Sequence, residues 1–517
     1  MDIRNPDVFK YTFKCVNNFE NGENVKKFHI LAIIYIFSFF TILPSFAQEE
    51  EGLIWNYRSD KFLESLKDGQ GIYDNETQKD LDNQIREGLD INLLPVDLKT
   101  CIYVALKNNY DIKIAETQKE EAKWNYARAS ADLLPDFYYR YQIQALHGEF
   151  LVGDILPRVI SQNPVYSGFR LDYPLGNGYT LFTMASKNNL YKSQKHNIKY
   201  TQSEILLNTT IYYYELLESK LNIEVLISNL RDRHEQLKLM QARYHIGIGT
   251  KYDILRADAQ YADAKQELIE ELNVLRLKQA QLANIMGLEV TLTLYPYEHG
   301  AYPRELIQKQ NTISGLYNIA LQVREDVQAK RAEIRSLVNL KNRNYTDFAP
   351  YVTFSYEYGR VGTTESPRLL PNHTVSFNVA VPLGNRMGLG TLTQKNADLA
   401  KIKTARFELT NLERNIKESI VSSYYSSKTA LERVEANKKQ VAAADEGLKF
   451  SLVGFDVGQN TFIDVLTSQT EKTKARQQLI RSIIAYNKAQ AKLLFDIGII
   501  SPKSLLLNYK GMDMDNP

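Results

Sequence analysis

Cysteine is scarce in this sequence. Of 517 residues only Cys15 and Cys101 are cysteines, and Cys15 falls in a segment that we expect to be removed, as argued below. Cys101 would then have no partner in its own chain, so the fold should not depend on an intrachain disulfide. A lone cysteine on a helix is expected to pack as a small apolar side chain rather than to react.

An excess of charge of either sign is also missing. Lysine and arginine together number 63, and aspartate and glutamate number 61, which leaves a net charge of +2. Nucleic-acid-binding domains carry a basic patch or stripe. The near balance of charges therefore argues against a nucleic-acid partner.

The sequence lacks the common catalytic motifs. It contains no H-E-x-x-H motif, no Cys/His metal spacing, no Walker loop and no nucleophile elbow. The segment Gly247-Ile248-Gly249 is too short to be a nucleotide loop. Three of the seven histidines, His196, His234 and His245, fall on long predicted helices, where solvated positions are more common than metal ligands. We therefore expect a protein that is not an enzyme and that uses no cofactor or metal.

Long hydrophobic runs are absent except for one near the N-terminus. Residues 28–42 are apolar, follow the basic pair Lys26 and Lys27, and end before Pro44. The run is short for a spanning helix, and the small residues leading to Ala47 suit a peptidase site. We predict cleavage after Ala47; the alternative is an uncleaved N-terminal anchor helix.

Residues 1–47 are thus predicted to be a signal peptide with an extended n-region, followed by a polar, acidic extension over 48–94. Beyond Ala47 no apolar run reaches the roughly 18 to 20 residues that a spanning helix needs. An exported chain of this kind is periplasmic, extracellular or a membrane β-barrel. The remaining sequence must decide between these three.

The most informative feature is an internal duplication. Short matching segments recur in the same order, which predicts a first repeat over 95–290, a second over 312–501 and a C-terminal tail over 502–517. The matches are Ala105-Leu106 with Ala320-Leu321, Asp111 with Asp326, Pro135 with Pro350, Pro174-Leu175-Gly176-Asn177 with Pro382-Leu383-Gly384-Asn385, Gly247 with Gly458, and Gly287 with Gly498.

Each repeat reads as helix, strand, loop, strand, long helix, break and helix. In the first repeat a helix is expected over 96–133, ended by Pro135. Strands are expected at about 136–145, 165–174, 351–360 and 373–382, because apolar and polar residues alternate there. Each strand has roughly ten residues, which crosses a bilayer when tilted. The polar positions expected to face water are Arg140, Gln142, Ser376 and Asn378.

The long helices carry a coiled-coil pattern. Steps of four and three residues from Ile205 to Tyr244 visit twelve positions, of which nine are apolar. A helix over 185–245 would be roughly 90 Å long, and its equivalent is expected over 392–455. An ordinary helical bundle is the alternative, but it accounts poorly for ten-residue strands joined to such helices.

Four strands per chain do not close a barrel, and a membrane does not tolerate open sheet edges. The missing strands must come from other copies of the chain. Two copies would give about eight strands, which side chains fill, whereas three give about twelve and leave a lumen. The predicted fold is a mixed α/β membrane protein, with a coiled-coil α-helical barrel and four transmembrane strands per chain closing as a twelve-stranded β-barrel in a trimer.

These features together resemble the TolC family of outer-membrane efflux proteins. The resemblance covers nearly all of 95–501. It rests on the duplication, the ALKNNYDI segment from Ala105, the proline before each hairpin, and the YHIGIGTKYDIL and FDVGQNTFIDVL turns. It implies a passive homotrimeric conduit in the outer membrane of a Gram-negative bacterium, reaching into the periplasm.

The resemblance also implies partners: outer-membrane lipid, a periplasmic adaptor protein, and an inner-membrane resistance-nodulation-division or ABC transporter, in an efflux or type I secretion system. A periplasmic or surface coiled-coil scaffold without a pore is the alternative. Soluble strands would be needed for that alternative.

The two helical tips are predicted to form the periplasmic entrance. Thr250 with Asp253, and Thr461 with Asp464, fit the capping pattern that starts a helix. Gly247 and Gly458 lie just before, where a helix ends in a left-handed residue. In a trimer the six carboxylates would surround the entrance and favour cations there, as the acidic residues of the family gate also suggest.

The resemblance implies a gate from which this chain departs. Members of the family often have a tyrosine before the glycine of the second turn and an arginine after it, where this chain has Phe455 and Asn460. In the first repeat Tyr244 keeps its hydroxyl. We expect the closed state to rely on packing instead of the hydrogen-bonded, charged lock of those relatives.

Overall fold

The computed structural model describes residues 93–151, 157–175, 178–298, 300–307, 312–364, 366–381 and 388–507. All of them belong to one compact unit, Leu81–Pro517. The predicted signal peptide, the extension up to residue 92 and the tail after residue 507 lie outside the described residues. Among the described helices, none combines the length and apolar character needed to span a membrane.

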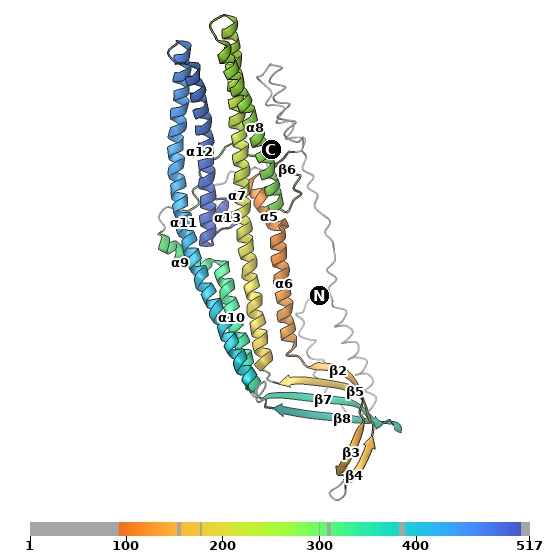
Figure 1. The fold of residues 1–517 in the computed structure, drawn as a ribbon. Coiled ribbons are helices and arrows are strands. Elements are labelled where there is room, and N and C mark those ends of the chain that lie inside the picture. The colour runs from red at the N-terminus through yellow and green to blue at the C-terminus, as the bar shows by residue number, and fades with distance from the viewer. Residues whose placement is uncertain are drawn as a thin grey trace, which may run out of the picture. The chain divides into compact units, whose positions relative to one another are not determined.

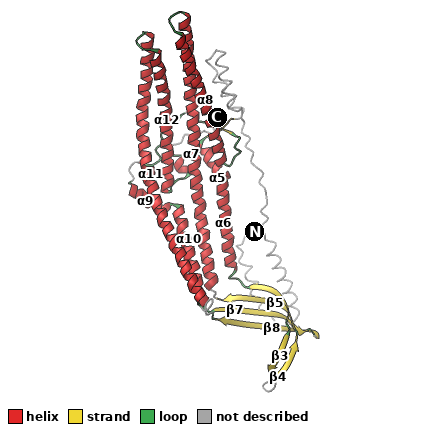
Figure 2. Cartoon of the chain, viewed as in Figure 1, coloured by secondary structure: helices red, strands yellow, loops and turns green. Residues whose placement is uncertain are grey.

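Long helices dominate, and most of the strands gather at one end of them (Figures 1 and 2). The described helices are α5 (Leu98–Asn108), α6 (Tyr110–Ala131), α7 (Gly178–His245), α8 (Lys251–Ile285), α9 (Ile313–Val323), α10 (Glu325–Tyr345), α11 (Leu389–Asp456), α12 (Phe462–Ile497) and the short α13 (Pro502–Leu505), with a 3-10 turn η1 (Thr346–Phe348). Both α7 and α11 have 68 residues, which makes each about 100 Å long.

The described strands form three sheets. The main sheet is antiparallel in the order β2 (Asp136–Ile143), β5 (Pro164–Leu175), β7 (Tyr351–Thr363) and β8 (Ser366–Ala380). These strands lie where alternation predicted strands, although β7 and β8 extend further toward their connecting turn. The sequence did not predict the hairpin of β3 (Leu146–Leu151) with β4 (Pro157–Gln162), or the parallel pair of β1 (Leu93–Val96) with β6 (Thr293–Pro296).

The single helix predicted over 96–133 is wrong. Val96 belongs to β1, and the helix starts only after Asp97, whose Oδ1 accepts a hydrogen bond of 2.8 Å from Thr100 N. The helix then breaks at Asn109, whose φ and ψ are −58° and 133°. Its Oδ1 accepts from the backbone N–H of Asp111 and Ile112, so this asparagine ends α5 and caps α6.

The segment predicted as the second repeat breaks its first helix at the equivalent place. Arg324, with φ −62° and ψ 126°, separates α9 from α10 as Asn109 separates α5 from α6. Asn109 Nδ2 donates to Ile285 O at 2.9 Å, two residues before Gly287, and Arg324 Nη1 donates to Asp496 O at 2.8 Å. Each break therefore carries a side chain that binds the end of the last long helix of its repeat.

The helices lie side by side in the same order as the strands. Near the sheet, α7 packs against α6 and α10, and α10 packs against α11. Toward the tips, α7 packs against α8 and α12, and α12 packs against α11. In both regions α11 lies at one edge of the chain, and α6 or α8 lies at the other (Figure 1).

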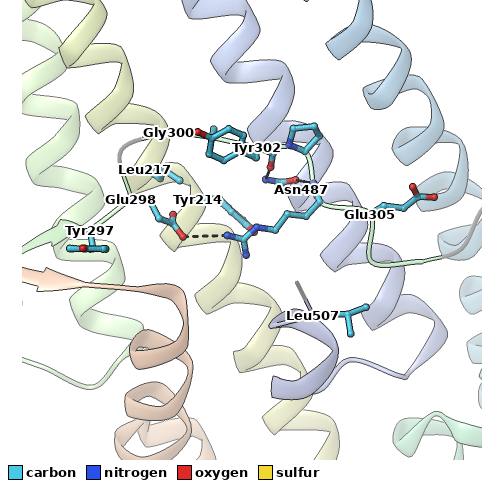
Figure 3. Close-up of a pocket in the computed structure, with 12 residues that line it drawn as sticks. Tyr214, Leu217, Tyr297, Glu298, Gly300, Tyr302, Glu305, Asn487 and Leu507 are labelled. Atoms are coloured by element: carbon cyan, nitrogen blue, oxygen red, sulfur yellow. Dashed lines mark hydrogen bonds and ion pairs between the residues drawn. The ribbon is translucent and has the colours of Figure 1, made fainter. Parts of the chain in front are cut away.

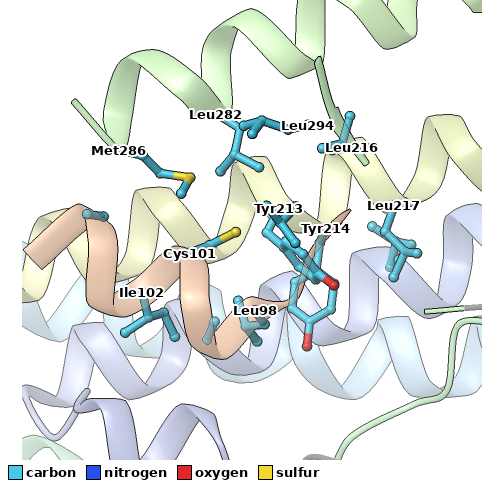
Figure 4. Close-up of a cluster of buried hydrophobic side chains, with 14 of the residues drawn as sticks. Leu98, Cys101, Ile102, Tyr213, Tyr214, Leu216, Leu217, Leu282, Met286 and Leu294 are labelled. Atoms are coloured by element: carbon cyan, nitrogen blue, oxygen red, sulfur yellow. The ribbon is translucent and has the colours of Figure 1, made fainter. Parts of the chain in front are cut away.

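The core lies where the short elements wrap around α7. Ten of the twelve predicted seam positions of α7 are buried, while Tyr212 is half-buried and Tyr244 is exposed. In addition, Tyr213 and Leu217 are buried in the same apolar cluster as Leu98 and Cys101 of α5, which the heptad pattern did not predict (Figure 4). Burial raises the pKa of the Cys101 thiol well above its usual value, so this cysteine packs rather than reacts.

Candidate functional site

The main sheet gathers polar residues on one face. Directly opposite residues of neighbouring antiparallel strands share a face, and the strand register therefore places the predicted water-facing positions Arg140, Gln142, Ser376 and Asn378 together. The other polar members of this face are Tyr138, Arg170, Asp172, Thr353, Ser355, Glu357 and Thr374.

Charged side chains on this face bind one another across three strands. Glu357 Oε1 lies 2.5 Å from Arg170 Nη1 and 3.3 Å from Arg140 Nη1. Arg170 Nε also lies 2.8 Å from Asp172 Oδ1, and Arg140 contacts Gln142. The sequence predicted the face but not this network, in which Glu357 joins two arginines from different strands.

The opposite face of the sheet is apolar and exposed. Phe137 stacks on Phe169 with ring centroids 5.5 Å apart, and Phe354 lies 5.1 Å from Phe377. Phe377 is nevertheless 66% exposed, and most residues of this face are exposed in the same way. Water-soluble monomers rarely leave so much contiguous apolar surface uncovered, so the sheet is suited to a hydrocarbon environment on this side.

Two glycines allow the two middle strands of the main sheet to approach each other closely. Gly168 of β5 and Gly359 of β7 are directly opposite each other. A Cβ atom added to Gly168 would lie 2.4 Å from Gly359 Cα and 2.5 Å from the carbonyl oxygen of Tyr358. Only glycine fits at this point, which the sequence reading did not single out.

The far ends of the helices form two capped tips. Thr250 Oγ1 accepts from Asp253 N at 3.2 Å, and Asp253 Oδ2 accepts from Thr250 N at 3.2 Å. In the second tip, Asp464 Oδ2 accepts from Thr461 N at 2.8 Å and from Thr461 Oγ1 at 2.7 Å. Both pairs are complete capping boxes. These hydrogen bonds lower the pKa of Asp464, so this exposed carboxylate stays ionised.

The predicted terminators have the conformation that the turn needs. Gly247 has a φ of 81° and Gly458 a φ of 76°, which is the left-handed region that L-residues with a side chain avoid. Among the described residues, no atom outside the two adjacent residues lies within 4 Å of a Cβ built on either glycine. The requirement for glycine at the tips is therefore conformational and not steric.

The three candidate gate residues have different surroundings. Tyr244 is exposed on α7. Phe455 packs against Phe462 with ring centroids 5.9 Å apart, within a small apolar cluster between the two tips. Asn460 Nδ2 donates to Ser451 O at 3.4 Å, so its amide is used inside its own turn.

An ion pair that the sequence reading missed joins the two tips. Arg243, at the end of α7, lies with its guanidinium carbon 4.1 Å from the ring centroid of Phe455. Arg243 Nη2 also lies 3.4 Å from Asp456 Oδ1. We call Arg243, Phe455 and Asp456 the tip clasp. The contact between the two tips of one chain therefore includes an ion pair as well as packing.

Further from the tips, polar bonds continue to join α7 to α12. Arg233 is 3% exposed, and its Nη2 donates to Thr470 Oγ1 at 2.8 Å. Gln469 Nε2 donates to Asp232 Oδ2 at 2.7 Å, and Thr473 Oγ1 donates to Asn229 Oδ1 at 3.2 Å. The two helical hairpins of one chain are thus bonded along their contact.

A cavity of about 510 Å³ lies where the connection after β6 crosses α7 and α12 (Figure 3). Arg304 pairs with Glu298 at 3.3 Å, and Asn487 Nδ2 donates to Tyr302 O at 2.9 Å. Burial raises the pKa of Tyr214 to about 12. Asn487 thus binds the connection to α12, while Arg304 and Glu298 pair within the connection. The described residues contain no group of three or more His, Cys, Asp or Glu that could hold a metal ion.

Comparison with known proteins agrees with this architecture. The family model described as "Outer membrane efflux protein" matches residues 101–288 and 316–498. The chain is 22% identical to the outer membrane efflux protein BepC of Brucella suis, over 61% of this chain and 68% of that protein. It is 22% identical to the outer membrane protein TolC of Salmonella enteritidis, over 66% and 75%, and 21% identical to the proteases secretion protein PrtF of Dickeya chrysanthemi, over 78% and 88%.

Solved structures show the same fold at low identity. The CmeC outer membrane channel of Campylobacter jejuni matches with a TM-score of 0.67 and 15% identity, over 78% of this chain and 85% of that chain. The open state of the MtrE outer membrane channel of Neisseria gonorrhoeae matches with a TM-score of 0.63 and 14% identity, over 78% and 89%.

Proposed function

This chain belongs to the outer membrane efflux protein family, and we propose that three copies of it close into one channel. The protein resides in the outer membrane of a Gram-negative bacterium, serves export and is not an enzyme. In the proposed assembly the four strands of β2, β5, β7 and β8 from each copy form a twelve-stranded barrel, and the long helices form a hollow cylinder below it.

One observation carries this proposal: the main sheet is apolar and exposed on one face, polar on the other, and open at both edges. Among the described residues, β2 pairs only with β5, and β8 pairs only with β7. Unpaired strand edges are not tolerated in hydrocarbon. Pairing β8 of one copy with β2 of the next satisfies both edges, with lipid against the apolar face and water against Arg140 and Arg170.

The helix order supports the same closure. The chain has α11 at one edge and α6 and α8 at the other, so a ring brings α11 of one copy against α6 and α8 of the next. Two copies would give about eight strands, whose interior side chains fill, while three leave room for a path. We therefore favour three copies over two.

The partners of the channel are also part of the proposal. Export across two membranes needs an energy source, and a passive channel has none. We propose that a periplasmic adaptor protein links this channel to an inner-membrane transporter of the resistance-nodulation-division or ABC type. The name of PrtF, which refers to protease secretion, supports a secretion route, whereas that of BepC, which refers to efflux, supports an efflux route.

We place the entrance of the channel at the helical tips. Three copies bring six carboxylates, from Asp253 and Asp464, to this end, and this should favour cations. Asparagine at either position keeps an oxygen for the cap while it removes the charge. In planar bilayers the D253N and D464N variants should therefore lose cation preference without unfolding the tips, and an unchanged preference in both would contradict this part.

Cysteine scanning along one strand tests the channel itself. Ser376 and Asn378 lie on the polar face of β8, and Phe377 and Val379 lie on the apolar face. A charged, membrane-impermeant thiol reagent should change the conductance of S376C and N378C channels and leave F377C and V379C channels unchanged, because only the first pair faces water.

The controls use the same protein. Wild type reports any reaction of the buried Cys101. Detergent-extracted protein should run as a heat-dissociable trimer. Equal reactivity of all four positions, or release of the protein by osmotic shock as a monomer, would favour a soluble scaffold and refute the channel.

A further inference from the structure

We propose that a polar pocket between α11 and α12 binds a hydrated divalent cation of the Mg²⁺ type. The pocket has a volume of about 270 Å³, and the carboxylates of Glu418 and Asp496 line it. One chain forms the whole pocket, so this site goes beyond the channel proposed above and does not depend on how many copies assemble. Three features point to this ligand: a buried carboxylate oxygen without a partner, a lining of oxygen atoms and a surplus of negative charge.

Asp496 is the residue that most clearly requires a partner. It is 2% exposed and lies near the C-terminal end of α12. Its Oδ1 lies 3.0 Å from Lys492 Nζ, whereas its Oδ2 is buried and has no hydrogen-bond partner in the described part of the chain. A buried carboxylate oxygen that is left unsatisfied costs free energy. A cation held in the pocket would therefore stabilise this side chain.

The side of the pocket that α11 contributes carries oxygen atoms. Glu418, Ser419, Ser422 and Ser426 lie there. Mg²⁺ prefers oxygen ligands, keeps several of its water molecules and is usually held by one or two carboxylates. The pocket suits such an ion, since its volume of about 270 Å³ equals that of about nine water molecules at roughly 30 Å³ each. It is not a cage for a dehydrated ion, because the described residues include no group of three or more His, Cys, Asp or Glu suited to a metal.

The charges of the pocket allow a divalent cation to replace Lys492. Glu418 and Asp496 supply two negative charges, and Lys492 supplies one positive charge. The Lys492 side chain is 46% exposed, and its Nζ also lies 5.0 Å from the ring centroid of Phe495. Its ammonium group can therefore leave Asp496 for water or for the ring. The two carboxylates then balance the charge of the bound ion, and Lys492 is a competitor that the ion must displace.

The pocket opens on the side of α11 and α12 that faces away from α9. Helix α9 packs against both of them, and its Leu316 shares an apolar cluster with Ile420 and Ile497. Residues two positions apart on a helix do not face the same neighbour, so Glu418 and Ser422 point away from α9. Three copies of α9 inside the proposed cylinder would obstruct its path. We therefore expect α9 on the outside of the channel and the pocket beside the water path.

Binding of Mn²⁺ tests the site. This ion shares the octahedral oxygen coordination of Mg²⁺, and electron paramagnetic resonance distinguishes free from bound Mn²⁺. The detergent-extracted protein should carry the background substitutions D253N and D464N, which remove the carboxylates of the tips. One Mn²⁺ per chain should then bind, and added Mg²⁺ should displace it. D496N and E418Q should each weaken the binding about tenfold or more, because each removes a negative charge beside a divalent ion.

Replacing Lys492 distinguishes a cation site from a structural ion pair. K492M removes the competing charge and should strengthen Mn²⁺ binding about threefold or more. A merely structural role of Lys492 would give no such gain. The matched control is D398N. Asp398 of α11 is 3% exposed, and both of its carboxylate oxygens already accept hydrogen bonds, from Asn344 and Gln394. D398N should leave Mn²⁺ binding unchanged.

The outcomes separate this site from the channel. Absence of bound Mn²⁺ at millimolar concentration, or equal binding by wild type, E418Q and D496N, would overturn the site, leave water as the partner of Asp496, and not affect the channel. Weaker binding by a folded K492M variant would also overturn it. Glu418 is exposed, so E418Q keeps the test valid if D496N does not fold. A protein that binds one Mn²⁺ per chain but forms no conducting pores would overturn the channel and not the site.

Discussion

The tip clasp supports a quantitative prediction about the proposed entrance. Arg243 makes two contacts with the second tip, a cation–π contact with Phe455 and an ion pair with Asp456. Replacing Arg243 with alanine removes both contacts. We expect the tips of each chain to separate more readily, so that the entrance spends more time in a high-conductance state.

The structure sets the expected size. The Asp456 side chain is 72% exposed, and an exposed ion pair contributes about 0.2–1 kcal/mol. A cation–π contact at such a site adds about 0.5–1 kcal/mol. R243A should therefore cost each clasp about 1–2 kcal/mol, which changes a two-state ratio about 5–30-fold. D456A leaves the aromatic contact in place and should have the smaller effect, below about fivefold.

Single-channel recording in planar bilayers measures this ratio. R243K should retain most of the closed state because it keeps a cation at the clasp. K251A is the matched control, since Lys251 is an exposed cation on the same tip and its removal reports any general effect of lost charge. An effect of D456A equal to or larger than that of R243A, or an equal effect of K251A, would refute the assigned role of the clasp.

Three further predictions concern stability. G458A should open the second tip about 5–30-fold more often, because a left-handed residue with a side chain costs about 1–2 kcal/mol; hydrogen exchange at the tip amides measures this, and unchanged exchange would contradict it. R170M leaves Glu357 with one fewer cation and should lower the temperature at which the proposed trimer dissociates. Adding N378D, on the same face, to R170M should not raise that temperature again. Burial would raise the pKa of Glu325, but hydrogen bonds from His196 and Lys199 lower this pKa overall. The ionised Glu325 side chain therefore stabilises the folded protein above its unfolded pKa of about 4.3, and this stabilisation is lost as the pH falls through the lower pKa of the folded state. The stability difference between wild type and E325Q should hold at pH 7 and disappear at low pH; a difference that grows on acidification would show the reverse linkage.

Local patterns explain why much of the fold was predictable. A strand with one apolar and one polar face alternates every second residue, so positions such as Arg140 and Asn378 could be assigned to one face before the sheet was known. A capping box lies within four residues, and Thr250 with Asp253 therefore identified a helix start by itself. The repeat extended each of these assignments to a second copy.

Long-range contacts explain most of what was missed. The break at Asn109 depends on Ile285, which lies 176 residues away in the chain. The sequence around an asparagine inside a helical pattern does not indicate such a distant partner. The pairing of β1 with β6 joins two four-residue strands that are too short to show alternation. The core position of Tyr213 likewise depends on α5 packing across α7.

The tip clasp was missed for a related reason. The predicted gate positions, taken from the family resemblance, were Phe455 and Asn460, whereas the ion pair is formed by Arg243 and Asp456. Each of these two residues is an unremarkable charge at a helix end when read alone. Only the packing of the two hairpins shows that they meet, with Phe455 between them.

The open edges of the main sheet also have a consequence for biogenesis. Before assembly, one chain exposes the apolar face that includes Phe377, and among the described residues the outer edges of β2 and β8 have no partner strand. Such a surface favours aggregation. A single copy is therefore not expected to be stable in the bilayer. In the proposed trimer, insertion should accompany the encounter of the three copies, and its rate should rise steeply with the supply of newly exported chains.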